Sequence, residues 1–191
     1  MKVRSIAADR DGNVWAGTFQ GGLNFCAAGT QTFSRIQLSP NAVDIRALKQ
    51  ESNTIMVCSN DGLFCLNRRT HEVIQHISKD NSVLSDNLVR AVATDANGYL
   101  WIGTFGRGVT IIDPTNLNKK IASIVDDSQL SNTIYHIICD SQNRVWVATG
   151  NGVAVFEQGE YTNYIRPETE GIIAYGFAED HNGNVWVSTN S

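Results

Sequence analysis

Carboxylates are the first residues in this chain that could do chemistry. The segment Asp9-Arg-Asp-Gly-Asn13 resembles the start of a calcium-binding loop, in which side-chain and backbone oxygens surround the ion. It lacks the distal Glu of such a loop, and the equivalent segment that begins at Asp140 keeps a single carboxylate. We therefore expect a turn at this place, and no metal or other cofactor in the chain.

Thiols and imidazoles are the next candidates. If Asp61-Gly62 is a hairpin turn, Cys58 and Cys65 face each other on adjacent strands and could form a disulfide. Direct cross-strand bridges are strained, so free thiols are the default expectation. His71 and His76 are five residues apart, which does not suit two metal ligands on one strand or helix. We expect both imidazoles to be solvated.

These residues belong to a repeat that fills the chain. Each of the four tryptophans follows an aspartate by six residues and precedes a threonine by three. The copies are Asp9, Trp15 and Thr18; Asp95, Trp101 and Thr104; Asp140, Trp146 and Thr149; and Asp180, Trp186 and Thr189. A degenerate copy, with Gln50 for the aspartate and Met56 for the tryptophan, lies between the first two. The resulting spacings of 41, 45, 45 and 40 residues indicate one structural unit per copy.

One copy predicts four short strands. Stretches rich in β-branched residues lie at 89–94, 100–104, 109–112 and 120–125, and each is bounded by Asn, Asp, Gly or Pro. This pattern is typical of a four-stranded antiparallel meander. The turn between the first two strands needs a residue that tolerates a left-handed backbone. The residues at this position are Gly12, Asn53, Gly98, Asn143 and Gly183.

A unit of this size cannot bury both faces of its sheet alone, so consecutive copies must stack. The predicted fold is all-β, a β-propeller of four-stranded antiparallel blades. The repeats span approximately residues 3–41, 42–83, 84–129, 130–170 and 171–191, and the last is incomplete. We expect the recurrent tryptophans to pack between blades, and the aspartates and threonines to satisfy turn amides.

The chain length does not correspond to a whole number of blades. Its 191 residues give about four and a half blades, whereas closed propellers contain whole blades. We therefore expect a piece of a larger ring, with open blade faces that drive self-association.

Composition excludes several classes of function. With 15 basic and 19 acidic residues, and no basic cluster, the chain lacks the electrostatic basis for binding nucleic acid or an anionic membrane. No apolar run is long enough to span a bilayer, and no signal segment follows Met1. Four scattered cysteines do not make a disulfide framework or a paired zinc motif, and Cys26 and Cys139 are expected to be small core residues.

The pattern V-x-x-I-x-x-D-x-x-G-x-[LV]-W-[IV]-G-T resembles the two-component regulator propeller repeat. It is preceded by Leu-Ser-x-Asn at 84–87, and a related Leu-Ser segment starts at Leu130. The resemblance implies a periplasmic, non-enzymatic sensor domain of a hybrid histidine kinase from gut Bacteroidetes, in a family where many members sense oligosaccharides. The family's immunoglobulin-like module, membrane helix, kinase and regulator are absent from this sequence. We therefore expect the chain to bind a ligand, and to reach a membrane only through regions outside it.

Binding residues should lie where the copies differ. The first strand of each blade lines the channel of a propeller, and the position eleven residues before each tryptophan holds Arg4, Ile45, Arg90, Tyr135 or Tyr175. Two residues later every copy is apolar, at Ile6, Ala47, Val92, Ile137 and Phe177, and these are expected to pack. Arginine and tyrosine suit sugars, acidic ones above all. The candidate ligand-binding residues are Arg4, Arg46, Arg90, Tyr135, His136, Tyr175, Phe19, Gln20, Phe105 and Arg107.

Two other functions remain open at this point. Streptogramin lyases and gluconolactonase-like enzymes are propellers with similar repeats, but their chemistry needs a metal or a His/Glu group at the channel, where this chain offers only His136. A protein-interaction scaffold is the other alternative.

Overall fold

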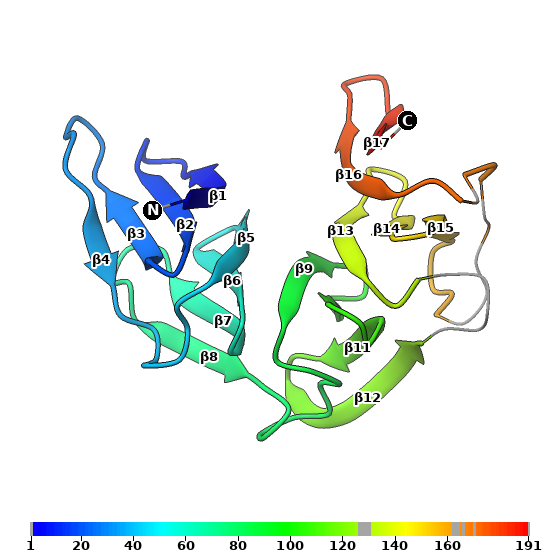
Figure 1. The fold of residues 1–191 in the computed structure, drawn as a ribbon, viewed down its shortest axis with the longest axis horizontal. Helices are drawn as coiled ribbons and strands as arrows, with labels where there is room; N and C mark the ends of the chain where they lie inside the picture. The colour runs from blue at the N-terminus through cyan, green and yellow to red at the C-terminus, as the bar shows by residue number, and fades with distance from the viewer. Residues whose placement is uncertain (1, 126–130, 162–164, 166, 170, 191) are drawn as a thin grey trace. The chain divides into compact units, whose positions relative to one another are not determined.

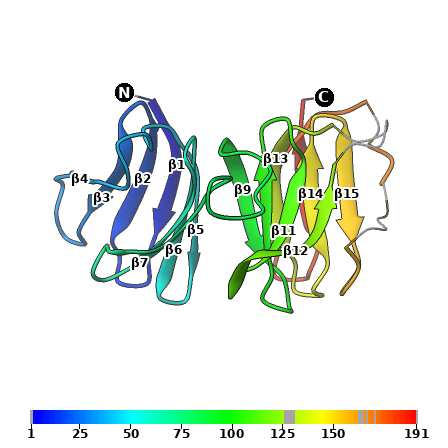
Figure 2. The same ribbon diagram turned by 90° about the horizontal axis from the view of Figure 1, so that it is seen from below.

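The computed structural model describes residues 2–125, 131–161, 165, 167–169 and 171–190 (Figures 1 and 2). All regular elements in these ranges are β-strands. They include no helix long and apolar enough to cross a bilayer. The chain divides into two compact units, residues 1–79 with 87–89 and residues 80–86 with 90–191, and each is described by itself.

Unit 1 contains two four-stranded antiparallel sheets. The first consists of β1 (Lys2–Ala8), β2 (Val14–Phe19), β3 (Gly22–Cys26) and β4 (Ser34–Ile36), in this order. The second consists of β5 (Ile45–Glu51), β6 (Thr54–Ser59), β7 (Gly62–Asn67) and β8 (Val73–Ile77). A core cluster that contains Trp15, Leu23, Ile45 and Phe64 joins them. The two sheets are therefore stacked blades.

Unit 2 continues the pattern with shorter sheets. Its four-stranded sheet consists of β9 (Val89–Thr94), β10 (Leu100–Thr104), β11 (Val109–Asp113) and β12 (Asn116–Ile124). The next sheet contains β13 (Ile134–Cys139), β14 (Val145–Thr149) and β15 (Gly152–Phe156), and an isolated bridge joins Val155 to Ile165. The last is the hairpin of β16 (Ala174–Glu179) and β17 (Val185–Thr189). The predicted all-β propeller of antiparallel blades is confirmed.

Each Asp-x-x-Gly turn is held by its aspartate. Asp9 Oδ1 accepts hydrogen bonds from the amides of Asp11 and Asn13, both 3.0 Å long. Its Oδ2 accepts one from the Trp15 indole Nε1 at 3.1 Å, and the other three copies repeat this bond at 2.8–3.0 Å. Burial raises the pKa of Asp9, but these hydrogen bonds outweigh it, so the pKa is lowered. The turn and the tryptophan thus form one unit.

The hydroxyl at the far end of β2 closes the next hairpin. Thr18 Oγ1 donates to the Gly22 carbonyl at 2.8 Å, and Thr104 and Thr149 make the equivalent bond to Gly108 and Gly152. Buried hydroxyls need such partners, since an unpaired one destabilises the fold.

The left-handed turn position is confirmed in four copies and wrong in one. The φ angles of Gly12, Gly98, Asn143 and Gly183 are 81°, 81°, 62° and 79°. In the degenerate second copy the left-handed residue is Ser52, with a φ of 47°, and not the predicted Asn53. Glu51 pairs directly with Thr54 there, so the turn is two residues long and has no place for a capping aspartate.

A second error concerns the β6–β7 turn. Ser59 pairs with Gly62, so the turn is Asn60-Asp61 rather than Asp61-Gly62. Cys58 consequently lies opposite Leu63 and does not face Cys65. All four cysteines are free thiols, and burial raises the pKa of Cys65 to about 11.

The sequence predicted that His71 and His76 are solvated, and this prediction was wrong, because both are half-buried. The His71 ring lies 5.1 Å from that of Trp15 and 4.3 Å from that of Phe25. His76 stacks on Phe64 at 4.0 Å, and its Nε2 is 2.6 Å from the Asp61 carbonyl. These rings belong to the packing between strands.

Blade stacking explains the glycine in W-[IV]-G-T. A Cβ at Gly17 would lie 2.5 Å from Cγ2 of Ile45 on the next blade, and one at Gly103 would lie 2.5 Å from Cγ2 of Ile134. Such distances are far inside ordinary carbon contact. The missing side chain of each glycine therefore leaves the space that an isoleucine of the following blade fills.

The tryptophans differ in burial. Trp15 and Trp101 are buried, and Trp146 is half-buried. Trp186 is 66% exposed, so the expectation that all four are core residues was wrong for this one. No strand in the described part of the chain covers its face.

Candidate functional site

A β-bulge interrupts the first strand of four blades at one equivalent place. The pairing with the second strand skips a residue between Val3 and Ser5, between Ile45 and Ala47, between Ile134 and His136, and between Ala174 and Gly176. The skipped residues are Arg4, Arg46, Tyr135 and Tyr175. A bulge redirects the side chain of its extra residue and is common next to functional sites.

The bulges correct the sequence assignment in one repeat. Counting back from Met56 placed Ile45 at this position, but the β5–β6 turn is one residue shorter, so Arg46 occupies the bulge. Ile45 is fully buried against Gly17 instead. The bulge residues are thus all arginine or tyrosine.

In unit 1, two of the predicted arginines meet an acidic residue. The Arg4 guanidinium carbon lies 4.9 Å from the centre of the Phe19 ring, and Arg46 Nη2 lies 2.5 Å from Asp44 Oδ2. Asp44 Oδ1 is 3.8 Å from Arg4 Nε and is buried without a hydrogen-bond partner in the described structure. We call these four residues, Arg4, Phe19, Asp44 and Arg46, the arginine cluster.

Asp44 was missed by the sequence reasoning. The feature that could have identified it is its position directly before the first strand of its blade, two residues before the bulge. From there its carboxylate reaches the bulge arginines of both β1 and β5. Gln20, also a candidate, is exposed in the β2–β3 turn with a φ of 61°.

In unit 2, the candidates form a continuous strip. The Arg90 guanidinium lies over the Phe105 ring at 4.2 Å and over the Tyr135 ring at 5.2 Å. Tyr135 contacts Tyr175 edge to face, with ring centres 5.3 Å apart. Phe105 and Tyr175 are exposed. We call Arg90, Phe105, Tyr135 and Tyr175 the aromatic strip.

Two other candidates lie beside the strip and not in it. His136 Nδ1 accepts a hydrogen bond from the Phe177 amide at 3.0 Å, which ties β13 to β16. Its neutral ring therefore carries its hydrogen on Nε2. The exposed Arg107 is held through its backbone, since its amide donates to Thr104 Oγ1 at 3.2 Å.

The side chains of both clusters have the chemistry of a binding surface. Aromatic faces pack on the C–H surfaces of pyranose rings, and guanidinium groups bind carboxylate or sulfate in a two-pronged geometry. Among the described residues, no three His, Cys, Asp or Glu side chains lie close enough to hold a metal ion.

Comparison with protein families gives one match. A profile described as two component regulator propeller matches residues 1–20, 83–106, 119–151 and 170–191. A comparison with curated protein sequences gave no significant match.

Solved structures include similar extracellular domains. That of the hybrid two component system BT3049 from B. thetaiotaomicron aligns with 100% of the chain at a TM-score of 0.87 and 32% identity. That of BT4673 from the same organism covers 99% at a TM-score of 0.76 and 18% identity. The chain spans 26% and 27% of these two proteins, or about a quarter of their length.

A lyase shares the architecture. Virginiamycin B lyase from Staphylococcus aureus covers 97% of the chain at a TM-score of 0.76 and 11% identity, and 62% of the lyase is matched. At this identity the similarity shows the fold alone.

Proposed function

Because the chain belongs to the two component regulator propeller family, we propose that it is a ligand-binding part of an extracytoplasmic sensor that recognises an oligosaccharide. Its homology to the extracellular domain of a hybrid two component system supports this proposal. In the whole protein the domain lies in the periplasm, and a histidine kinase outside this chain receives the signal.

The observation that carries the proposal is the aromatic strip. Arg90 is held between the rings of Phe105 and Tyr135, at 4.2 Å and 5.2 Å, so its long side chain is already ordered. Preordered groups lose less conformational entropy when they bind. Tyr175 continues the strip with an exposed aromatic surface. A flat, amphipathic sugar ring matches such a surface.

The arginine cluster of unit 1 favours an acidic ligand. Two guanidinium groups share one carboxylate, that of Asp44, so the cluster keeps one net positive charge. Arg4 and Arg46 remain partly exposed, with 38% and 26% of their side-chain surface accessible. We therefore propose that this cluster is a separate binding surface within unit 1, and that it pairs with a carboxylate or sulfate group of an acidic sugar.

The proposed role is non-enzymatic. The strip holds aromatic rings and a guanidinium group, and His136, the imidazole beside it, is engaged by the amide of Phe177. A binding site of this kind changes the stability of the domain when occupied, which is what a sensor needs.

A binding titration tests the function. Isothermal calorimetry with uronate-containing, sulfated and neutral oligosaccharides should give saturable binding for an acidic member of the panel. Tyr175→Ala should weaken binding at the aromatic strip at least tenfold, while Phe33→Ala, an exposed aromatic outside both clusters, should leave it unchanged. Absence of binding by every member, or equal affinity for the Tyr175 variant, would refute the proposal.

A further inference from the structure

The residue directly after the threonine or serine of the repeat differs between blades. The five residues at this position are Phe19, Asn60, Phe105, Gly150 and Asn190. Both phenylalanine rings lie against an arginine of the first strand of their own blade. The centre of the Phe19 ring is 4.9 Å from the Arg4 guanidinium carbon. That of Phe105 is 4.2 Å from the guanidinium carbon of Arg90. The two asparagines make a different kind of contact.

Asn60 holds the chain where it enters β5. Its Oδ1 accepts hydrogen bonds from the amides of Val43 at 3.2 Å and Asp44 at 2.9 Å. Its Nδ2 donates to the Asn41 carbonyl at 2.9 Å, and its own amide donates to the Asp44 carbonyl at 3.1 Å. Asn60 therefore binds both peptide groups of Asp44, the residue that stands two positions before the bulge residue Arg46.

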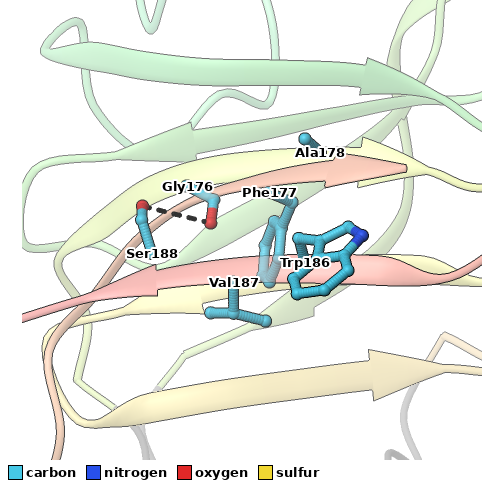
Figure 3. Close-up of a pocket in the computed structure, with 6 residues that line it drawn as sticks. All are labelled: Gly176, Phe177, Ala178, Trp186, Val187 and Ser188. Atoms are coloured by element: carbon cyan, nitrogen blue, oxygen red, sulfur yellow. Dashed lines mark hydrogen bonds between the residues drawn. The ribbon is translucent and has the colours of Figure 1, made fainter. Parts of the chain in front are cut away.

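Asn190 makes the same pair of contacts where the chain enters β16. Its Oδ1 accepts a hydrogen bond from the Ile173 amide at 2.9 Å, and its amide donates to the Ile173 carbonyl at 3.2 Å. Ile173 stands two positions before the bulge residue Tyr175. After the bulge, Ser188 Oγ donates to the Gly176 carbonyl at 3.4 Å (Figure 3). The backbone that carries Tyr175 is thus held on both sides.

A residue that holds this backbone orders the binding side chain further along the strand. The Asp44 carboxylate lies 2.5 Å from Arg46 Nη2, so fixing Asp44 also fixes the position of the guanidinium. At Tyr175 the backbone of the bulge sets the direction of the ring itself. Long side chains lose conformational entropy when a ligand immobilises them, and ordering them beforehand reduces that loss.

We propose that Asn60 and Asn190 are positioning residues of the two binding surfaces, Asn60 for the arginine cluster and Asn190 for the aromatic strip. Their effect on affinity rests on the sugar-binding function proposed above. Phenylalanine at the same position adds an aromatic ring to the surface, whereas asparagine orders the residue that the first strand presents.

Amide hydrogen exchange measures the two contacts without any ligand. Asn60→Ala removes the acceptor of the Asp44 amide, so this amide should exchange at least tenfold faster, while the Ile173 amide should not change. Asn190→Ala should have the reverse effect. Asn118→Ala, an exposed asparagine on the outer strand β12, is the matched control and should alter neither amide.

Calorimetry with a uronate-containing oligosaccharide measures the effect on binding, one surface at a time. The Tyr175→Ala chain leaves the arginine cluster as the binding surface, so adding Asn60→Ala should weaken binding at least tenfold and adding Asn190→Ala should not. The Arg46→Ala chain leaves the aromatic strip, and there the two effects should be exchanged. General damage to the fold would weaken binding in both chains, so this crossed pattern is specific to positioning.

Unchanged exchange of the Asp44 and Ile173 amides in the two asparagine variants would overturn the proposal. Binding that falls equally in both chains, or in neither, would also overturn it. A wild-type chain that does not bind the oligosaccharide would refute the proposed function and with it the effect on affinity, while the exchange rates would still decide whether the two asparagines hold the strand entries.

Discussion

Gly103 should tolerate a methyl group only if Ile134 is shortened. In Gly103→Ala the new Cβ would lie 2.5 Å from Ile134 Cγ2, 2.9 Å from Ile134 Cβ and 3.1 Å from Ile137 Cδ1. Carbon atoms in contact lie about 3.5–4.0 Å apart, so the two blades must separate locally by about 1 Å. Overpacking of this kind lowers the free energy of unfolding by about 1–3 kcal/mol.

The compensating change is Ile134→Ala, which reproduces the alanine pair found at Ala148 and Ala174. Alone it removes a buried side chain and should lower the free energy of unfolding by about 2–5 kcal/mol. In the double variant the alanine at 103 occupies part of the vacated space, so the two losses should sum to more than the loss in the double variant. We expect a coupling of about 1 kcal/mol or more.

Urea unfolding of the four proteins, followed by tryptophan fluorescence, measures this coupling. Gly176→Ala is the control, because its Cβ would meet Ser188 Oγ at 3.5 Å, an ordinary contact, and should leave the free energy of unfolding unchanged. If the losses in the free energy of unfolding add to within about 0.5 kcal/mol, Gly103 does not provide the space that Ile134 fills. A neutral Gly103→Ala would refute the stacking argument outright.

Three further predictions concern turns, acid and thiols. Asn143→Ala should lower the free energy of unfolding by about 1 kcal/mol, whereas Asn143→Gly should not, because a φ of 62° suits glycine. Urea unfolding of the two variants measures the difference. Equal losses of stability would contradict the left-handed turn at residue 143. Hydrogen bonds from Asn184 and Trp186 lower the pKa of Asp180 from 3.8 to about 2, so its unfolded form binds protons first on acidification and its stabilising effect is lost as the pH falls from about 4 to 2. Asp180→Asn should remove that part of the pH dependence, as read by urea unfolding at several pH values; an unchanged pH profile would argue against it. Cys58 and Cys65 should react with a thiol reagent only after unfolding, since burial raises the pKa of both thiols. The half-buried Cys139 should react in the folded chain. Rapid labelling of all thiols in the native state would contradict the burial of Cys58 and Cys65.

The sequence predicted the strands well where local signals agree. The stretches 89–94 and 100–104 coincide with β9 and β10, because β-branched residues and bounding turns mark the same ends. The sequence prediction was wrong at the β6–β7 turn, because a glycine can lie either within a turn or directly after it. Gly62 suggested the turn itself, but it is the first paired residue after a turn at Asn60-Asp61, with a φ of 93°. The register, and with it the distance between Cys58 and Cys65, follows from that choice.

Other features depend on partners distant in sequence. The bulge that selects Arg46 over Ile45 depends on the length of the β5–β6 turn, one residue shorter than in the other repeats. The role of the buried Asp44 carboxylate could not be predicted from the sequence, because it depends on arginines that two different strands place beside it. The sequence shows the glycine of the repeat only as part of a pattern. The structure gives the reason for it, because an isoleucine of the next blade fills the space that a side chain would need.

Calorimetric titration of an acidic oligosaccharide into the wild-type chain and into Arg46→Ala tests the central proposal most directly. We predict saturable binding to the wild type that weakens at higher salt, and at least tenfold weaker binding to the variant, because a guanidinium that pairs with the ligand is lost. Equal affinity of both proteins, or binding that salt does not affect, would contradict recognition of an acidic sugar by the arginine cluster.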